Sequence, residues 1–264
     1  MPHETTVRLA SFLSVFAVVA LFEYLAPRRP LTTPKGQRWL VNGSIVVLDT
    51  LVVRYVSPLL PNGLAELAAV NGWGVLNLVA LPFWSKVLIA FMVFDLIIYL
   101  QHRAFHRIPI LWRLHRIHHT DLDLDVSSGI RFHPIEIIIS ICIKMAVVVL
   151  IGAPPLAVVL FEIILNATSL FNHGNMAIPL PVDRWLRLFL VTPDMHRVHH
   201  SVIPRETDSN FCFNFPWWDR LMGTYRAQPV AGHDAMQIGL KEFRSAGQLG
   251  LLHLLVLPFK GRRG

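Results

Sequence analysis

The chain has 264 residues, of which 53% are hydrophobic and only 16% charged, and its formal net charge is +7. A soluble domain of this length carries nearer a quarter charged residues, so the apolar surplus, which is concentrated in long runs, predicts an integral membrane protein. The two cysteines, Cys142 and Cys212, are too few for a disulfide framework or a cysteine-held iron–sulfur cluster.

Five apolar stretches follow in chain order, at residues 7–26, 40–60, 84–101, 134–151 and 155–172. A spanning helix needs about 20 apolar residues and at least about 17, so we expect an all-α membrane bundle with roughly four or five transmembrane helices. Residues 61–82 are expected to be re-entrant or interfacial. The Gly-Ala-Pro-Pro sequence at 152–155 predicts a tight turn between the last two stretches. Lys144 lies in the middle of the fourth stretch and is expected to snorkel or to pair.

Eight of the 13 histidines lie in three clusters with helical spacing. His102 and His106 are four residues apart, and the phrase His-Arg-Ile-His-His at 115–119 recurs as His-Arg-Val-His-His at 196–200. On a helix, this spacing puts the rings of each cluster on one face. Many neutral imidazoles brought together are the usual way in which a protein holds transition-metal ions. The candidate metal ligands are therefore His102, His106, His115, His118, His119, His196, His199 and His200.

Two more histidines lie at predicted helix ends, level with the clusters. His133 opens the fourth apolar stretch and His173 closes the fifth, so both are candidate ligands. Asn175, two residues beyond, is a candidate for a water-bridged contact. The alternative for each is that it bonds spare backbone groups at a helix end. Glu136, three residues after His133, is expected to remain interfacial.

A polar stripe leads to the first histidine cluster. Asp95 and Tyr99 precede His102 and His106 at helical intervals, so all four share a face. Metal-bound histidines commonly donate their other N–H to a carboxylate. We therefore expect Asp95, Tyr99 and Asp194, which lies beside the third cluster, to support the ligands. The alternatives are an Asp–Arg pair elsewhere for Asp95 and a solvated loop charge for Asp194.

The number of histidines favours two metal ions. A catalytic zinc site needs about three protein ligands, and the zinc-hydrolase helix needs His-Glu-x-x-His, whereas an arginine follows the first histidine of each cluster here. Imidazole suits iron, copper or zinc, and two metals beside a bilayer favour a redox metal that oxidises a lipid C–H bond. A histidine-rich membrane metal transporter or sensor remains an alternative, which would place its histidines along a path within the helices; a membrane zinc hydrolase is a second.

The orientation follows from the basic residues. Arginines and lysines gather at 28–38, at 102–133 and after residue 173, whereas the 61–83 and 152–155 connections hold none. The positive-inside rule therefore places the N-terminus outside, and the histidines in a helical cap on the cytosolic face of a bacterial plasma membrane or a eukaryotic ER-type membrane. Because the arginines flank apolar runs, we expect no nucleic-acid partner. We expect one membrane domain, 1–264, whose apolar tail at 247–258 packs on the membrane surface.

Three motifs and a C-terminal stretch carry a family resemblance. The motifs are Asp95-x3-Tyr99-x2-His102-Arg103-x2-His106, His115-x2-His118-His119 and Thr192-Pro193-x2-His196-Arg197-Val198-His199-His200-Ser201. Together with Asn210-Phe211 and Trp218–Tyr225, they resemble the fatty acid hydroxylase/sterol desaturase superfamily over a catalytic region at 90–226. The sequence Arg131-Phe132-His133-Pro134 is similar to members near the alkylglycerol monooxygenases and bacterial sterol-desaturase-like proteins.

The resemblance implies a membrane-bound non-haem diiron oxygenase with its two irons on the cytosolic face. Members use O2 and two electrons to hydroxylate or desaturate lipid chains, sterols or related substrates. The eight clustered histidines would be iron ligands, and His173 takes the place of a further ligand histidine. Some members carry another histidine four residues earlier, but position 169 is Ser; His133, an asparagine or a water then takes that place, or one metal is less fully coordinated. No haem- or flavin-binding segment is evident, so a separate electron-transfer protein or reductant is expected.

Overall fold

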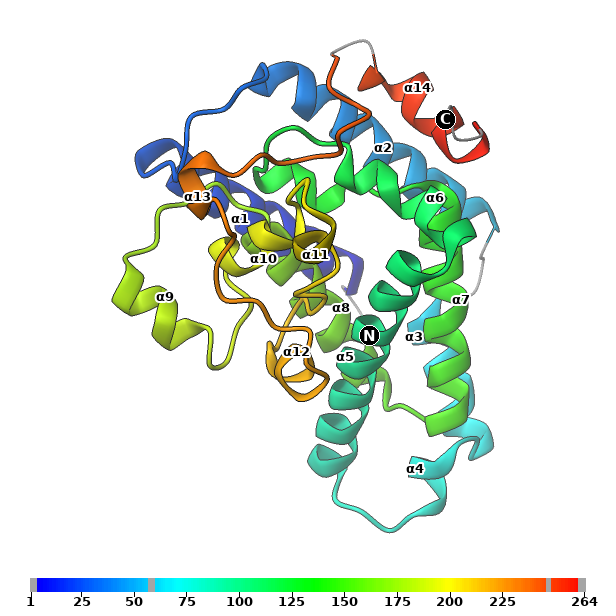
Figure 1. The fold of residues 1–264 in the computed structure, drawn as a ribbon. Coiled ribbons are helices and arrows are strands. Elements are labelled where there is room, and N and C mark those ends of the chain that lie inside the picture. The colour runs from blue at the N-terminus through cyan, green and yellow to red at the C-terminus, as the bar shows by residue number, and fades with distance from the viewer. Residues whose placement is uncertain (1–3, 57–59, 246–247, 261–264) are drawn as a thin grey trace.

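The computed structural model describes residues 4–56, 60–245 and 248–260. Within these ranges all regular structure is helical, apart from two isolated bridges, so the all-α prediction is confirmed. Residues 57–59 of the second predicted stretch and Gly247 of the predicted surface tail lie outside the described residues. Five long helices form the body of the molecule (Figure 1): α1 (Glu4–Leu25), α2 (Lys35–Val56), α5 (Phe83–Arg107), α7 (Pro134–Ile151) and α8 (Pro155–Asn172).

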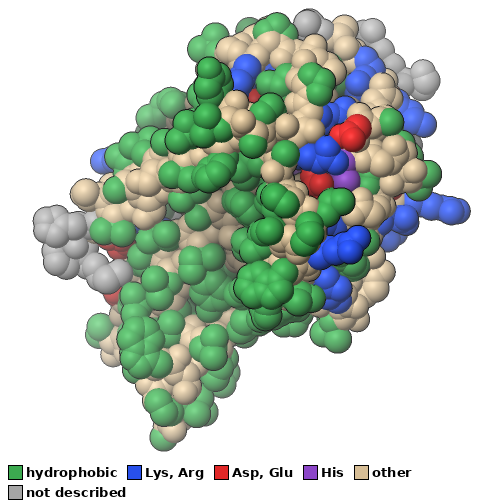
Figure 2. All heavy atoms as spheres, turned by 90° about the vertical axis from the view of Figure 1, so that its left-hand side faces the viewer, with side chains coloured by type: hydrophobic (Ala, Val, Ile, Leu, Met, Phe, Trp, Pro, Cys, Tyr) green, Lys and Arg blue, Asp and Glu red, His purple; other side chains and the backbone are tan. Residues whose placement is uncertain are grey.

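Five helical stretches are long and apolar enough to cross a membrane, so the chain is a multi-pass membrane protein. Four of them are α1, α5, α7 and α8; the other, Lys35–Leu78, contains α2 and the short helices α3 (Pro61–Asn71) and α4 (Val75–Leu78). Hydrophobic side chains spread over much of the face in Figure 2, whereas Lys and Arg gather towards one side of it. An apolar surface of this extent fits contact with lipid.

The predicted turn at 152–155 is confirmed, because α7 ends at Ile151 and α8 begins at Pro155. Gly152 ends α7 with a φ of 66°, a conformation that glycine adopts without strain. The backbone of Gly74 packs so closely that a Cβ there would lie 2.0 Å from Gly152 N. The 61–82 segment is thus helical and part of the bundle, since α3 also packs against both α7 and α8.

Lys144 is paired, as expected for a charge in an apolar run. Its Nζ lies 2.5 Å from Glu162 Oε1, and Arg8 Nη1 lies 2.7 Å from Oε2 of the same carboxylate. Arg8 also pairs with Glu4, whose other oxygen accepts a hydrogen bond of 2.7 Å from Asn62 Nδ2. This network joins α1, α3, α7 and α8, and we call it the interhelical ion-pair network.

Apart from α3, α4 and α12, the short helices gather at the end of the long helices away from α4, which we call the histidine end (Figure 1). They are α6 (Pro109–His119), η1 (Val126–Ile130), α9 (Leu180–Leu186), α10 (Pro193–His199), α11 (Pro204–Thr207), α13 (Gly232–Ala235), α14 (Leu251–Val256) and η3 (Leu257–Phe259). The short helix α12 (Trp217–Leu221) lies beside the middle of α5. The 28–38 loop joins them: Thr33 Oγ1 donates to Asp123 Oδ2 over 2.6 Å, and Arg29 Nη1 donates to Met236 O over 3.0 Å. The three basic segments therefore meet at one end.

The C-terminal tail packs on the histidine end. Leu254 and Leu257 are buried against Ile45 of α2 and Ile117 of α6. Leu252 is 78% exposed on the outer side of α14. The tail therefore buries one apolar face in the protein and leaves another open.

Candidate metal centre

Four helix ends carry the predicted ligands into one region. His102 and His106 lie in the last turns of α5, and Pro109 starts α6 almost at once. Pro193 starts α10, whose N-cap Thr192 accepts a hydrogen bond from the backbone of the next turn. His173 is the C-cap of α8. Short connections and proline starts thus fix the directions in which the helix ends meet.

The nine histidines form two groups. The five-histidine group consists of His102, His106, His115, His119 and His199. The four-histidine group consists of His118, His173, His196 and His200. Within each group, one atom from every ring lies within 4.8 Å of all the others, and the side chains are buried. The structure therefore brings together all eight clustered histidines and His173, in groups of the size expected for two metals.

Each repeated phrase divides between the two groups. In both phrases the first and last histidines, four residues apart, enter one group, and the middle histidine enters the other. His118 thus leaves the group of its helical neighbours, and so does His199. Residues at i+3 and i+4 point about 100° apart around a helix. The shared face expected from the spacing is therefore divided between two sites, and α6 and α10 each serve both.

Most of the rings are oriented by a hydrogen bond from Nδ1. The backbone acceptors are Phe211 O for His102 (2.7 Å), Arg131 O for His118 (3.3 Å), Ser169 O for His173 (2.7 Å) and Ser209 O for His199 (2.8 Å). A carbonyl oxygen can only accept, so Nδ1 carries the hydrogen. In each of these neutral rings Nε2 consequently keeps its lone pair.

The Nε2 lone pairs face one another across each group. The Nε2 atoms of His118 and His173 lie 3.0 Å apart, and those of His102 and His115 lie 3.1 Å apart. Nitrogens about 2.1 Å from a common ion are about 3.0–3.4 Å apart. Three further Nε2 atoms are buried without a hydrogen-bond partner in the described chain, those of His106, His119 and His199. A cation in each group would satisfy these lone pairs, so the donor set fits metal ions.

Burial keeps the imidazoles neutral. Burial first, and the neighbouring imidazoles next, lower the pKa well below its ordinary value of 6.5 in four rings: His118, His119, His196 and His200. Burial also lowers the pKa of His173 to about 4 and that of His199 to about 3. Neutral imidazole is the form that ligates metal, so these rings are ready to bind an ion near pH 7.

Glu136 supports the centre, although the sequence predicted it to be interfacial. It is buried in the first turn of α7, and its Oε1 accepts a hydrogen bond of 2.7 Å from Nδ1 of His115. A carboxylate behind a ligating histidine fixes the ring and raises its basicity. Asp208 lies near His106, with its Oδ1 3.4 Å from Nδ1, but the two atoms form no hydrogen bond. The available signal for Glu136 was a carboxylate in an otherwise apolar run.

His133 and Asn175 lie outside both groups. His133 caps α7: its Nδ1 accepts from Ile135 N over 3.1 Å, and its Nε2 lies 3.2 Å from Leu255 O. The side chain of Asn175 bonds the backbone of Arg29 in both directions, at 2.8 and 3.2 Å. Backbone bonding, the alternative considered for each, is therefore what the structure shows.

The expected support from Asp95, Tyr99 and Asp194 differs from the structure. Trp218 Nε1 donates to Asp95 over 2.8 Å, and the Tyr99 hydroxyl lies 3.0 Å from Thr224 Oγ1. Asp194 forms ion pairs with two arginines. Within the described residues none of the three bonds a histidine of either group. They instead tie α5 to the 210–225 segment and α10 to the N-terminal loop, which positions the histidine-bearing helices.

Two buried arginines fix the end of α6. Arg131 donates to Ile117 O over 3.0 Å and to Thr120 Oγ1 over 2.8 Å. Arg38 of α2 contacts both oxygens of Asp121, at 2.8 and 2.9 Å. Burial opposes ionisation of Asp121, but the pKa of this carboxyl is held below its usual range by Arg38. The histidine-bearing end of α6 is thus anchored by charge-assisted hydrogen bonds.

Comparison with known proteins decides the family. The fatty acid hydroxylase family matches residues 87–224, just over half of the chain. The chain belongs to this family. It is 28% identical, over 96% of its length and 76% of the relative's, to the ornithine lipid hydroxylase of Rhizobium tropici. No solved structure gave a significant match.

Two kinds of animal enzyme are also similar. The alkylglycerol monooxygenase of Xenopus tropicalis is 27% identical over 72% of this chain, and the cholesterol 25-hydroxylase of Rattus norvegicus is 25% identical over 55% of it. The chain spans less than half the length of each. The relatives are hydroxylases and monooxygenases, so this family member is an oxidoreductase of the fatty acid hydroxylase type.

Proposed function

We propose that the chain is a non-haem diiron oxygenase that uses O2 and two electrons to hydroxylate or desaturate a lipid or sterol-like substrate. One observation carries the proposal: nine buried imidazoles form two neighbouring sets of donor atoms. The names of the relatives support a lipid substrate, because they act on an ornithine lipid, an alkylglycerol and cholesterol.

The five-histidine and four-histidine groups would each hold one iron ion. Bound iron would supply O2 activation and hydrogen removal from an unactivated C–H bond. The protein orients the rings through their Nδ1 acceptors and limits access of water with aromatic side chains. Phe132 stacks on His118 at 4.5 Å between ring centroids, and Phe213 lies 5.0 Å from His102.

The reaction balances with two electrons and two protons. In hydroxylation, one atom of O2 enters the C–H bond to give an alcohol, and the other leaves as water. In desaturation, the substrate loses two hydrogens to form a C=C bond, and both oxygen atoms leave as water. The electrons would come from a separate electron-transfer protein or reductant.

The histidine end would lie on the cytosolic side. The three basic segments meet there, and the 61–83 and 152–155 connections, which lack basic residues, meet at the other end. The positive-inside rule then assigns the basic end to the cytosol, at the plasma membrane in a bacterium or an ER-type membrane in a eukaryote. The histidine end would then face the compartment that contains the reduced electron donors.

Metal analysis combined with lipid analysis tests the proposal. Protein loaded with ferrous iron should hold about two irons per chain, since ligands are available for two ions. Untargeted lipid mass spectrometry should show an oxidised lipid in cells that carry the chain, and not in cells that carry His118→Ala. Lipid profiles that do not differ between the two, with full iron content in the unmodified chain, would contradict the assigned activity.

A further inference from the structure

A large cavity adjoins the five-histidine group. Its volume is about 1170 Å³, comparable with the largest small-molecule sites. His106 lines this cavity and is itself a member of the group. Trp112 lines it too, and its ring centroid lies 5.4 Å from that of His119. A molecule in the cavity is therefore separated from the proposed metal site by a single layer of side chains.

One part of the cavity wall is apolar. It is lined by Trp112 of α6, by Leu240 and Phe243, which follow α13 in the chain, and by Leu257 of η3. The outer side of the same C-terminal tail is exposed and apolar, with Phe259 at 65% exposure. An aliphatic chain would find matching surface both inside the cavity and at its edge.

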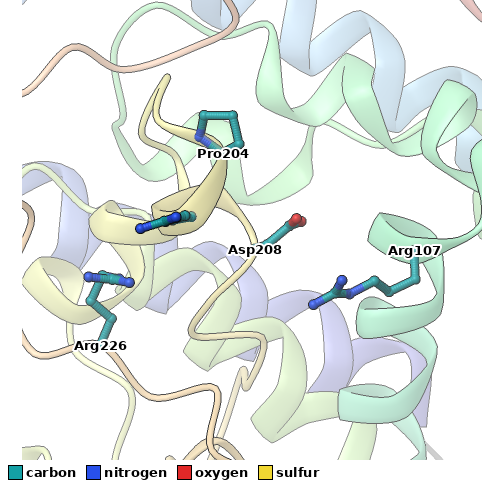
Figure 3. Close-up of a pocket in the computed structure, with 5 residues that line it drawn as sticks. Arg107, Pro204, Asp208 and Arg226 are labelled. Carbon is teal, nitrogen blue, oxygen red and sulfur yellow. The ribbon is translucent and has the colours of Figure 1, made fainter.

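The other part of the wall is basic. Arg107, Lys241 and Lys260 line the cavity and are exposed. An adjoining hollow of about 350 Å³ is lined by Arg107 again, by Arg205 and by Arg226. In Figure 3, Arg107 extends from α5 towards Asp208, and Arg226 lies beyond it on the other side of the hollow.

These basic groups are in excess. Five basic side chains line the two hollows besides Arg116, and only two acidic ones do, Asp208 and Glu242. Arg116 already donates to the carbonyls of Leu257 and Lys260. Within the described residues, no carboxylate lies within ion-pair distance of Arg107, Lys241 or Arg205. The charge of Arg107 acts on Asp208, but five cations against two carboxylates leave the hollows with a net positive charge. An excess of cations next to an apolar wall is complementary to an oxyanion attached to a hydrocarbon chain.

We propose that this cavity binds the substrate and selects a lipid with an anionic headgroup, a phosphate or a carboxylate. The headgroup lies on Arg107 and Lys241, with Arg205 and Arg226 behind, and the chain lies against Trp112 and Phe243. That the bound lipid is a substrate rests on the proposed function. The preference for an anionic headgroup can be measured by binding alone, without turnover.

The test is a matched pair of lipids. Binding of a monoacylglycerol and of its phosphate monoester, with the same acyl chain, is measured on the full chain in neutral-detergent micelles by native mass spectrometry. The phosphate ester should bind about tenfold more tightly, and this preference should fall below about threefold in Arg107→Gln/Lys241→Gln. The control Lys86→Gln/Arg184→Gln removes the same charge away from the cavity and should keep the full preference.

Three results would overturn the inference. They are equal binding of the two lipids, an undiminished preference in Arg107→Gln/Lys241→Gln, and an equal loss in the control pair. Inorganic phosphate is the competitor that separates a headgroup site from a plain phosphate site. Displacement of the lipid by equimolar phosphate would also overturn the inference, whereas retention of the lipid supports it.

The two proposals fail separately. A headgroup preference without any lipid oxidation by the iron-loaded chain would contradict the oxygenase assignment and leave this site standing. Oxidation of neutral and anionic lipids with equal KM, in a chain that shows no binding preference, would contradict only the headgroup site. Iron content measured in every variant shows that the metal centre is intact.

Discussion

The five-histidine and four-histidine groups are built from the same helices, but their surroundings differ. The five-histidine group adjoins a cavity through His106, and carboxylates of Glu136 and Asp208 face its rings. In the four-histidine group all four residues are fully buried, and the Nδ1 acceptors of His118 and His173 are backbone carbonyls. Closed sites with rigid ligands are typical of structural metals, and sites with access are typical of reacting ones. If each group holds an iron ion as proposed, the difference predicts a reacting metal in the five-histidine group and a structural one in the four-histidine group.

Removal of one ligand from each group is the change with the largest expected effect. His118 and His119 are adjacent in sequence but belong to different groups. We expect His118→Ala and His119→Ala each to lower iron from about two to about one per chain, and turnover by more than about 100-fold, since loss of outer partners alone costs about 10–100-fold. Metal analysis and a lipid oxidation assay on both variants check this. Full turnover in either variant would show that the group which lost a histidine is not needed for activity.

Loss of the carboxylate behind His115 should affect one group only. Glu136→Gln keeps the size of the side chain and removes its charge, so we expect the affinity of the five-histidine group for metal to fall about 10–100-fold. The four-histidine group should be unchanged. Titration of the metal-free protein with ferrous iron, followed by spectroscopy, resolves the two events. A parallel fall in both affinities would show that the groups act as one unit.

Metal removal should proceed in two phases. A chelator can approach the five-histidine group through the cavity beside His106, whereas the four-histidine group is enclosed. We expect one equivalent of iron to leave faster than the other, and we expect the fast phase to speed up further in Glu136→Gln. Stopped-flow absorbance with a coloured ferrous chelator measures the rates. A single phase for both equivalents would count against a difference in access.

The sequence predicted which histidines come together better than how they divide into groups. The i, i+4 and i, i+3 intervals are local properties of a helix, so the eight clustered histidines and His173 could be identified from spacing and position. The separation of His118 from His119 depends on which helix faces each ring, and that is a tertiary property. The acceptor of His102, Phe211 O, is 109 residues away in the chain, and sequence spacing carries no information about it.

The membrane-spanning helices also show that local features could be predicted from the sequence, whereas tertiary contacts could not. Apolar runs predicted α7 and α8 to the residue and the ends of α1, α2 and α5 to within six residues, because hydropathy is additive along the chain. The pairing of Lys144 was expected, but its partner, Glu162, depends on the way in which α7 and α8 face each other. The burial of Glu136 was missed for a related reason: helix ends can face lipid headgroups or a protein interior, and only packing decides between them.

The smallest effect is expected in the interhelical ion-pair network. Lys144→Gln removes one of two cations that contact Glu162, and Arg8 remains to pair with it. Because polar contacts in membranes contribute about 0.6 kcal/mol on average, we expect a loss of about 1 kcal/mol of stability. Thermal unfolding of the variant measures this. Iron content and turnover should be unchanged. A loss of either would show that the ion-pair network affects the five-histidine or the four-histidine group.

Anomalous diffraction at the iron edge from crystals of the iron-loaded protein tests the central claim most directly. We expect two peaks, one among the nitrogens of His102, His106, His115, His119 and His199, and one among those of His118, His173, His196 and His200. A single peak, or peaks away from these rings, would contradict it.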